Sequence, residues 1–587
     1  MKALFSNNNI LTLIKRQPKY LLVVFIKTLR GFLFRKNGYY GEYGISNDLI
    51  DQIKNINTLI FSIDLNDNRN WYAEFAIKAQ KKHKWDFGRH DHLEKIFEEL
   101  IDVGEMPVNP IDKEDYWSAV QVNWLFFNVR SGKTNEINTQ FILNANCQFL
   151  LKNKNHWIYR PFTISEVISN LIKIKLYFGD SLIFSNNIKR FLNESVLFLL
   201  QHLEVYKNSS KNSLNHTNNH VLSNVRALFW ATKIYSNSQI EDIAEYIFKE
   251  YCLPLFDDGI LDEGSTVYHF IAAQCIRDIS YFISYEELPR VDKIINELDK
   301  YGFLEPSTFP VIGDVSPDPS LCSVMDDAME ITKKMGQESH FLVKSQNSKS
   351  LCSQNIGDYG LHNYGNWKWI VHARDSSKHI QHSHNDYGSP VLIYKNTTII
   401  CDLGRPSYMN MEEAKNYAST KYHSVPQISG LDQNPRAIRD IYPKHFLVPN
   451  ITNSVPFDSK LLENCDKPYE FVCGGRYLLY PNYLYGGFWV RNFICNSDDQ
   501  QEIIIEDLVN LNKKSYVHFR FFMPSFFSKS AMVDCEYRLN GISIFPSEKK
   551  ILRNISYGQT AEAYEAKIFS EPSVMHHLTT KLRIVNE

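Results

Sequence analysis

Glycine and proline are distributed unequally along the chain, and this limits what it can fold into. Residues 45–300 contain 6 Gly and 5 Pro, whereas the shorter range 355–587 contains 12 of each. Long stretches without these residues suit helices, and frequent turn residues suit short strands. At 587 residues the chain is too long for one hydrophobic core. We therefore expect a helical domain followed by a β domain.

Hydrophobic periodicity in the first half predicts amphipathic helices. Apolar residues recur three and four positions apart in SEVISNLIKIKLYF (165–178), IKRFLNESVLFLLQHLEVY (188–206) and NVRALFWATKIY (224–235). This spacing places them on one face of a helix. The first half is therefore predicted to be mostly α, with repeated helical pairs.

The second half contains short runs rich in β-branched and aromatic residues. They are WKWIVHARD (367–375), PVLIYKNTTIICDLG (390–404), GGFWVRNFIC (486–495), QEIIIEDLV (501–509), YVHFRFFMP (516–524) and YRLNGISIF (537–545). Asn540-Gly541 is a strong hairpin signal, and Lys395-Asn396 is expected to form another turn. We predict a large antiparallel β-sandwich, with residues 301–354, rich in Ser, Pro and Asp, as the connection.

Composition excludes some functions. A net charge of −2 provides no basic field for nucleic acid. The ten cysteines form no CxxC pair and no metal-ligand spacing, which is typical of scattered thiols in a reducing compartment, although a single disulfide stays open. We expect no nucleic-acid partner and no organic cofactor.

The N-terminus is basic. Residues 1–41 contain eight Lys or Arg and no acidic residue, around the apolar core YLLVVFI (20–26). That core is too short to span a bilayer, and no small-residue cleavage site of a signal peptide follows it. Two interpretations stay open for residues 1–44: a helix packed on its own domain, which we favour, and a basic amphipathic helix in peripheral contact with the inner membrane.

The motif HSHNDYG (382–388) places polar groups at alternate positions. In a strand, His382, His384 and Asp386 would share one face. Three titratable groups on one face are costly to bury without a metal, a hydrogen-bond network or an anionic substrate. A solvated surface strand is the alternative.

A second group of polar residues lies in the helical half. Asn219 and His220 begin an apolar helical run, and DDGILDEGSTVYHF (257–270) brings Glu263, Ser265 and Tyr268 close together in sequence. Taken singly, an Asn before a helix is more often a cap than a catalytic group, and a Tyr-His pair is usually packing. The combination with the strand motif favours a functional site.

Seven motifs in order resemble one family, the heparinase II/III-like polysaccharide lyases. They are WIYRPFTISEVISN (157–170), NNH (218–220), DGILDEGSTVYH (258–269), IGD (312–314), HSHND (382–386), CDLGRPSY (401–408) and KYHSV (421–425). The resemblance implies an α+β fold in which an incomplete α/α toroid (45–315) precedes an antiparallel β-sandwich (355–587), with residues 316–354 as linker.

The resemblance also implies roles for individual residues. Catalytic groups are expected at Asn219, His220, Tyr268, His382 and Tyr408, with Tyr417 as a weaker substitute for the last. A zinc ion, structural or site-shaping, is expected at His384, Asp402 and His423, a reasonable ligand set for that metal. Asp386 is expected to orient a neighbouring histidine, with a cap or turn role as the alternative. Candidates for contacts with an acidic sugar are Arg160, Arg374, Arg405 and Glu263.

The implied activity is β-elimination on a uronic-acid-containing polysaccharide, in capsule or O-antigen metabolism. Three alternatives stay open: a uronate C5-epimerase on the same scaffold, a non-catalytic polysaccharide-binding or assembly protein, and a metal-dependent hydrolase using His384, Asp402 and His423. We expect a cytoplasmic or inner-membrane-associated protein, with the periplasm left open.

Overall fold

The computed structural model describes about half of the chain. Its ranges, with short gaps, are 135–152, 159–205, 219–283, 311–314, 352–405, 416–433, 471–496, 501–524, 533–556 and 559–585, together with a few isolated positions. Residues 1–44 and 316–351 lie outside the described residues. Our predictions for the basic N-terminal segment and for most of the linker therefore stay predictions.

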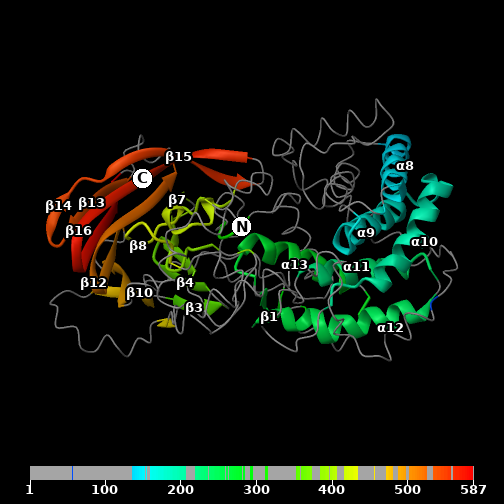
Figure 1. The fold of residues 1–587 in the computed structure, drawn as a ribbon, viewed down its shortest axis with the longest axis horizontal. Coiled ribbons are helices and arrows are strands. Elements are labelled where there is room, and N and C mark those ends of the chain that lie inside the picture. The colour runs from blue at the N-terminus through cyan, green and yellow to red at the C-terminus, as the bar shows by residue number, and fades with distance from the viewer. Residues whose placement is uncertain are drawn as a thin grey trace, which may run out of the picture.

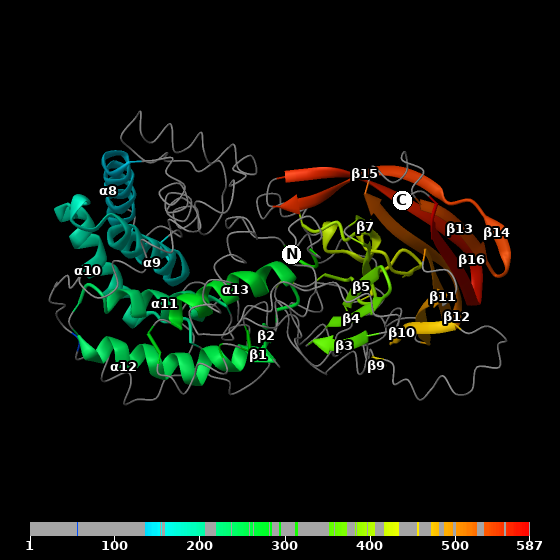
Figure 2. The same cartoon turned by 180° about the vertical axis from the view of Figure 1, so that it is seen from behind.

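The described part of the first half is helical and forms one end of the molecule (Figures 1 and 2). Its helices are α8 (Glu136–Lys152), α9 (Pro161–Phe178), α10 (Asn186–Gln201), α11 (His220–Ala231), α12 (Ser238–Ile247) and α13 (Thr266–Ile279), with short turns η2 (Gly179–Ser181), η3 (Phe248–Cys252) and η4 (Leu253–Leu255). The three helices predicted from periodicity are confirmed as α9, α10 and α11. A two-stranded ribbon of β1 (Phe256–Asp257) and β2 (Ile260–Leu261) precedes α13.

Local chemistry explains where these helices begin. Pro161 occupies the first turn of α9, where its missing N–H costs nothing. The side chains of Ser185 and Ser265 cap α10 and α13 by accepting backbone N–H groups. Helix α11 packs against α9, α12 and α13 and is buried from Val221 to Ala231, so it forms the centre of this lobe.

Two antiparallel sheets form the other end. The smaller has the order β3-β4-β5-β6-β7, and the larger runs β14-β13-β16-β12-β11-β10-β9, with β15 on β16 and β8 on β12. The strands are β3 (Cys352–Ile356), β4 (Tyr359–Tyr364), β5 (Trp367–His372), β6 (Pro390–Tyr394), β7 (Thr397–Ile400), β8 (Gln427–Ile428), β9 (Val455–Pro456), β10 (Phe471–Leu479), β11 (Phe488–Asn496), β12 (Glu502–Pro524), β13 (Val533–Leu539), β14 (Ile542–Ile544), β15 (Ser547–Ser556) and β16 (Gln559–Ile584). Strand β3 begins inside the segment predicted as linker.

The sheets share one hydrophobic core, as expected for a sandwich. Trp369 of the small sheet stacks on Phe493 of the large one, with ring centroids 5.5 Å apart. Both hairpin predictions are confirmed: Asn540 and Gly541 join β13 to β14 with positive φ values of 50° and 84°, and Lys395, φ 51°, lies between β6 and β7. Helices followed by antiparallel sheets make this an α+β protein.

The strands of the second half differ from the sequence-based expectation in several places: the predicted runs did not include β3, β4, β8, β9, β10, β15 and β16. The predicted strands 501–509 and 516–524 are one long strand, β12, with irregular pairing to β16 between Asn510 and Val517. Strand β16 was not anticipated because Pro572 interrupts its pattern; that proline lies where the register with β12 shifts, a place where a missing N–H is tolerated. The described residues between His382 and Ser389 do not form a strand; they form bends and a turn before β6.

The helical lobe contains a buried group of four charges. Lys173 of α9 pairs with Asp278 of α13, and Arg226 of α11 pairs with Glu166 of α9. Arg226 also lies 3.7 Å from Asp278. Because two cations and two anions compensate one another, the three helices can share a charged interior.

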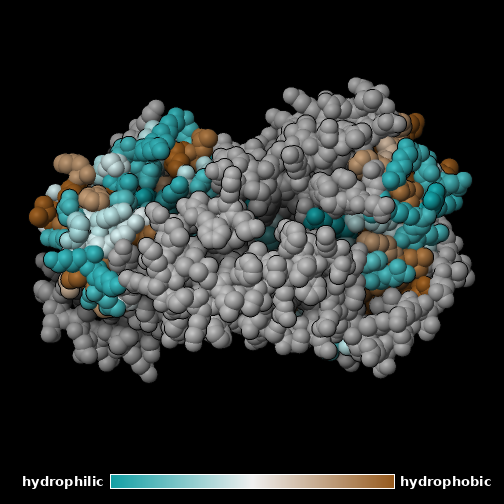
Figure 3. Space-filling view, in the orientation of Figure 1, coloured by the Kyte–Doolittle hydropathy of each residue, from teal (hydrophilic) through white to brown (hydrophobic). Residues whose placement is uncertain are grey.

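The described surface is mixed. Figure 3 shows hydrophilic residues interspersed with hydrophobic ones at both ends of the molecule. No helix within the described ranges combines the length and the apolarity that a membrane span requires.

We expect Asp278→Ala to destabilise the helical lobe strongly. Removing this carboxylate leaves Lys173 buried without its partner, a change that typically costs about 3–5 kcal/mol. Urea unfolding followed by helical circular dichroism measures it. The control is Arg190→Ala, which breaks the solvent-exposed Arg190–Glu194 pair and should leave the midpoint nearly unchanged. Equal effects of the two substitutions would contradict the prediction.

Candidate active site and metal centre

The carboxylate of Asp314 joins three of the candidate residues. Its Oδ2 accepts hydrogen bonds from His382 Nδ1 at 3.1 Å and Arg405 Nη1 at 2.9 Å, and its Oδ1 accepts one from His384 Nε2 at 2.9 Å. Burial alone would raise the pKa of Asp314, but Arg405 and the two histidines hold that pKa well below its usual value. The charged form is therefore the stable one.

Close backbone approach brings Asp314 to this position. The N–H of Asp314 donates to the carbonyl of His382 at 3.0 Å, and the N–H of His382 donates to the carbonyl of Glu263 at 3.2 Å. Gly313 has a φ of +78°, and a Cβ there would lie 2.5 Å from the Gly264 oxygen and 2.8 Å from the His382 oxygen. Only glycine fits here.

Tyr268 and His382 meet across the two halves of the chain. Their rings stack with centroids 3.6 Å apart and planes 11° from parallel. Tyr268 lies in the first turn of α13, where its backbone N–H is held by the Ser265 hydroxyl, which itself donates to the backbone oxygen of Asp314. The cap of α13 thus fixes the phenol beside the imidazole.

Glu263 connects Asn219 to the same group. One carboxylate oxygen accepts the backbone N–H of Asn219 at 2.7 Å, and the other lies 3.6 Å from His382 Nε2. Asn219 precedes α11 but its side chain makes no capping bond. Within the part of the chain that the structure describes, its buried Oδ1 has no hydrogen-bond partner. Such an atom calls for an explanation, and a ligand is one.

His220 is held by a separate network. Its Nδ1 lies 3.0 Å from Glu204 Oε1, and its ring packs on Phe162. Glu204 is positioned in turn by Asn224, which accepts its backbone N–H at 2.9 Å and donates to Oε2 at 3.3 Å. The side chain of His220 is 37% exposed, so substrate could reach it.

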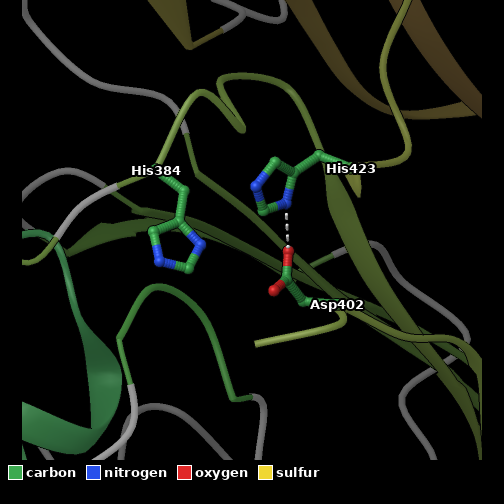
Figure 4. A group of neighbouring side chains, drawn as sticks. All are labelled: His384, Asp402 and His423. Atoms are coloured by element: carbon green, nitrogen blue, oxygen red, sulfur yellow. Dashed lines mark hydrogen bonds and ion pairs between the residues drawn. The ribbon is translucent and has the colours of Figure 1, made fainter. Parts of the chain in front are cut away.

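The three predicted metal ligands converge (Figure 4). One ligand atom from each of His384, Asp402 and His423 lies within 4.8 Å of the others. All three come from loops: His384 precedes β6, Asp402 follows β7, and His423 follows the short turn η6 (Thr420–Tyr422). All three are buried.

The free ring nitrogens suit a metal ion. His423 Nδ1 donates to Asp402 Oδ2 at 2.8 Å, which leaves its Nε2 without a hydrogen-bond partner among the described residues; His384 Nδ1 is likewise unpartnered there. Burial lowers the pKa of His384 against the opposing effect of Asp314, which favours the neutral form that binds metals. Burial also opposes charge on His423, but Asp402 raises its pKa overall. Two imidazoles and a carboxylate fit zinc.

Asp386 points to a different partner. Its Oδ1 accepts a hydrogen bond from Nδ1 of His372, 2.7 Å away, and both side chains are fully buried. Asp386 therefore bonds a histidine, as expected, but that histidine is His372 of β5 and not one of the candidate site residues, so its orienting role stays a prediction. We expected His382, His384 and Asp386 to share one face, but only His382 and His384 do, since both bond Asp314.

The remaining candidates are placed as follows. Arg405 is 3% exposed and pairs with Asp314. It therefore stabilises the carboxylate that bonds His382 and His384 and is too buried to be a surface contact for a sugar. Arg160 is half-buried at the start of α9. The hydroxyl of Tyr417 donates to the Leu552 carbonyl, which makes it a poor substitute for Tyr408. Tyr408 and Arg374 lie outside the described residues.

Three participants were not assigned from the sequence: Asp314, Glu204 and His372. Asp314 carried a signal, because it ends the IGD motif between the two halves. Glu204 and His372 carried none, since one polar residue after an amphipathic helix or at a strand end is common on surfaces.

Comparison with known proteins identifies the β domain. Residues 353–580 match the family described as Heparinase II/III-like, C-terminal. The β-sandwich is similar to the C-terminal domain of heparinase II/III-like proteins. This match supports, over the β domain, the resemblance stated above. No curated protein matches the chain.

Solved structures extend the likeness over both lobes. Heparinase III, the BT4657 gene product, matches with a TM-score of 0.53 at 12% identity, over 93% of this chain and 92% of that one. Its form with methylated lysines gives 0.51, with the same identity and coverage. A heparan sulfate lyase HepC mutant from Pedobacter heparinus gives 0.49 at 12% identity, over 91% and 93%. At 12% identity, the heparinase III likeness establishes a common fold.

We expect His423→Ala to abolish high-affinity zinc binding, because it removes the ring nitrogen that faces His384. Protein dialysed against zinc and then buffer should carry about one ion per chain by elemental analysis, and the variant should carry none. His576→Ala is the control, since His576 is equally buried in the sandwich but bonds Ser570 and Ser573. Retention of the ion by His423→Ala would show that the metal lies elsewhere.

Proposed function

We propose that the protein is a polysaccharide lyase that cleaves a uronic-acid-containing chain by β-elimination. The observation that carries the proposal is the convergence of Asn219, Glu263 and Tyr268 from the helical lobe with His382 from the sandwich. Residues so far apart in sequence are brought to one place by contacts of 2.7–3.6 Å. The heparinase II/III-like domain supports the same chemistry.

The first chemical requirement is neutralisation of the uronate carboxylate. The C5 proton is weakly acidic while that carboxylate keeps its full charge. The Asn219 amide and the His382 imidazole can hydrogen-bond it and stabilise the enolate-like state that forms as the proton leaves. Asp314 holds His382 through Nδ1, so the ring is already oriented when substrate arrives.

The second requirement is a base for C5 and an acid for O4. Tyr268 is our first choice for both roles, with His220 as the other candidate. As the base takes the C5 proton, the electron pair of that bond forms the C4=C5 double bond. The C4–O4 bond breaks, and O4 leaves with a proton from the acid. The products are an unsaturated uronate at the new non-reducing end and a shortened chain. Acid-base help of this kind typically contributes about 10²- to 10⁴-fold.

We further propose that His384, Asp402 and His423 hold zinc. A bound ion there would supply positive charge and fix the loops around it. His384 shares Asp314 with His382, so ordering the first imidazole also orders the second.

Three finer assignments are also proposed. The helical lobe is an incomplete α/α toroid over residues 45–315. The substrate is an unsulfated bacterial capsule or O-antigen polyuronide, bound in part through Arg160 and Arg374. The site of action is the cytoplasm or the inner-membrane surface. Assays on purified sulfated glycosaminoglycans, alginate and capsule polyuronides test the substrate directly.

We expect Tyr268→Phe to abolish turnover while retaining binding, because only the hydroxyl is lost and the stack on His382 remains. The readout is the absorbance of the conjugated double bond, with binding measured by calorimetry. Tyr159→Phe is the matched control: it removes a buried hydroxyl from the same lobe, one that bonds Ser195, and should keep full activity.

Several outcomes would replace the lyase assignment. Inversion at C5 without a double bond would indicate an epimerase. Prompt loss of activity on chelation, with saturated products, would indicate a metal-dependent hydrolase. Binding by the unaltered protein with no turnover on any polyuronide would indicate a binding or assembly protein.

A further inference from the structure

Arg491 of β11 forms an unusual set of contacts beneath the metal loops. Its side chain is 1% exposed. Nε and Nη2 donate to the two carboxylate oxygens of Asp507 at 2.7 and 2.9 Å. Nη1 donates to two backbone carbonyls, those of Gly388 at 2.8 Å and Ser424 at 2.6 Å. One guanidinium therefore joins a strand of the large sheet to two separate loops.

Those two loops carry the proposed histidine ligands. Gly388 belongs to the turn that follows His384, and Ser424 is the residue after His423. The loops also contact each other, because the Ser424 N–H donates to the Ser389 hydroxyl at 3.1 Å. Nη1 of Arg491 donates to a backbone carbonyl of each loop, so it limits how far apart the two loops, and with them the two imidazoles, can lie.

The guanidinium is itself rigidly placed. Asp507 is its direct cross-strand neighbour on β12 and also accepts the indole N–H of Trp489 at 2.9 Å. The guanidinium lies over the Trp489 ring, 4.9 Å from its centroid. A bidentate carboxylate and an aromatic face leave Arg491 one arrangement, and a lysine could not reproduce this planar fork.

We propose that Arg491 is a positioning residue for the metal centre: it sets the separation of His384 and His423 without touching the ion or the substrate. This inference rests on the zinc site proposed above. It explains the spacing of the two histidine ligands by a residue outside the ligand set, Arg491 on β11 of the large sheet.

Arg491→Lys tests the proposal, with Arg520→Lys as control. Arg520 is 6% exposed in the same sheet and pairs with Glu565 at 2.8 Å. Its hydrogen bonds among the described residues go to Glu565 and His518, which lie on the strands and not on the ligand loops. Zinc affinity is measured by competition with a chromophoric chelator, and site geometry by the visible absorption of Co²⁺-loaded protein. We expect Arg491→Lys to weaken zinc binding by about 10- to 100-fold, as for other outer-shell groups, and to alter the cobalt spectrum. Arg520→Lys should change neither.

A second variant guards against misfolding. Ser389→Ala removes only the hydroxyl that links the loops, and should weaken zinc binding in the same direction but less. Unaltered affinity and cobalt spectrum in folded Arg491→Lys, or equal losses in both arginine variants, would overturn the positioning role. Absence of zinc binding by the unaltered protein would overturn it together with the metal site. The lyase assignment is judged separately by the double-bond assay.

Discussion

The buried carboxylate of Asp314 is the group on which the rest of the site depends. An ionised carboxylate moved out of water without partners would take up a proton. Here His382, His384 and Arg405 all donate to it, and charge-assisted bonds of this kind are short and strong. Because the two histidines share one anion, the imidazole proposed to face substrate and the one proposed to bind zinc cannot reorient independently.

The position of Asp314 follows from backbone contact between segments distant in sequence. Gly313 permits a close backbone approach that any side chain would block. The N–H of His382 then donates to the carbonyl of Glu263, and the N–H of Asp314 donates to the carbonyl of His382. These two backbone hydrogen bonds connect the lobes. The candidate site therefore lies where the two lobes meet and contains residues from both. Tyr268 and Asn219 lie on one side of it and His382 on the other, so neither lobe contains the site alone.

The parts of the structure set by local chemistry could be predicted from the sequence. Helix α9 and the Asn540-Gly541 hairpin depend on side-chain period and turn residues within a few positions. The error at His382 has an equally clear cause. Alternating polar residues indicate a strand only if the backbone finds a ladder, and here the backbone bonds go to Glu263 and, from Asn385, to Ala418. Partners that distant leave no local signal.

Buried polar partners were the least predictable part of the site. Glu204 and Asp507 look in sequence like ordinary surface acids. Only the folded chain shows that Glu204 bonds the imidazole of His220 and that Asp507 bonds the guanidinium of Arg491. Asp314 ends the IGD motif, but its partners are distant in sequence, so the motif alone did not indicate its role. Family resemblance indicated the groups that we propose to act on substrate, whereas the groups that hold them in place are visible only from the contacts in the folded chain.

These contacts place the proposed metal centre under restraint from two directions. Asp314 holds His384 from the side of the helical lobe, and Arg491 holds the loops of His384 and His423 from the large sheet. The small sheet lies between, with Asp386 bonded to His372 of β5. Zinc bound at the proposed centre would hold His384, which shares Asp314 with His382, and in that way it would support the proposed lyase activity without contacting the substrate.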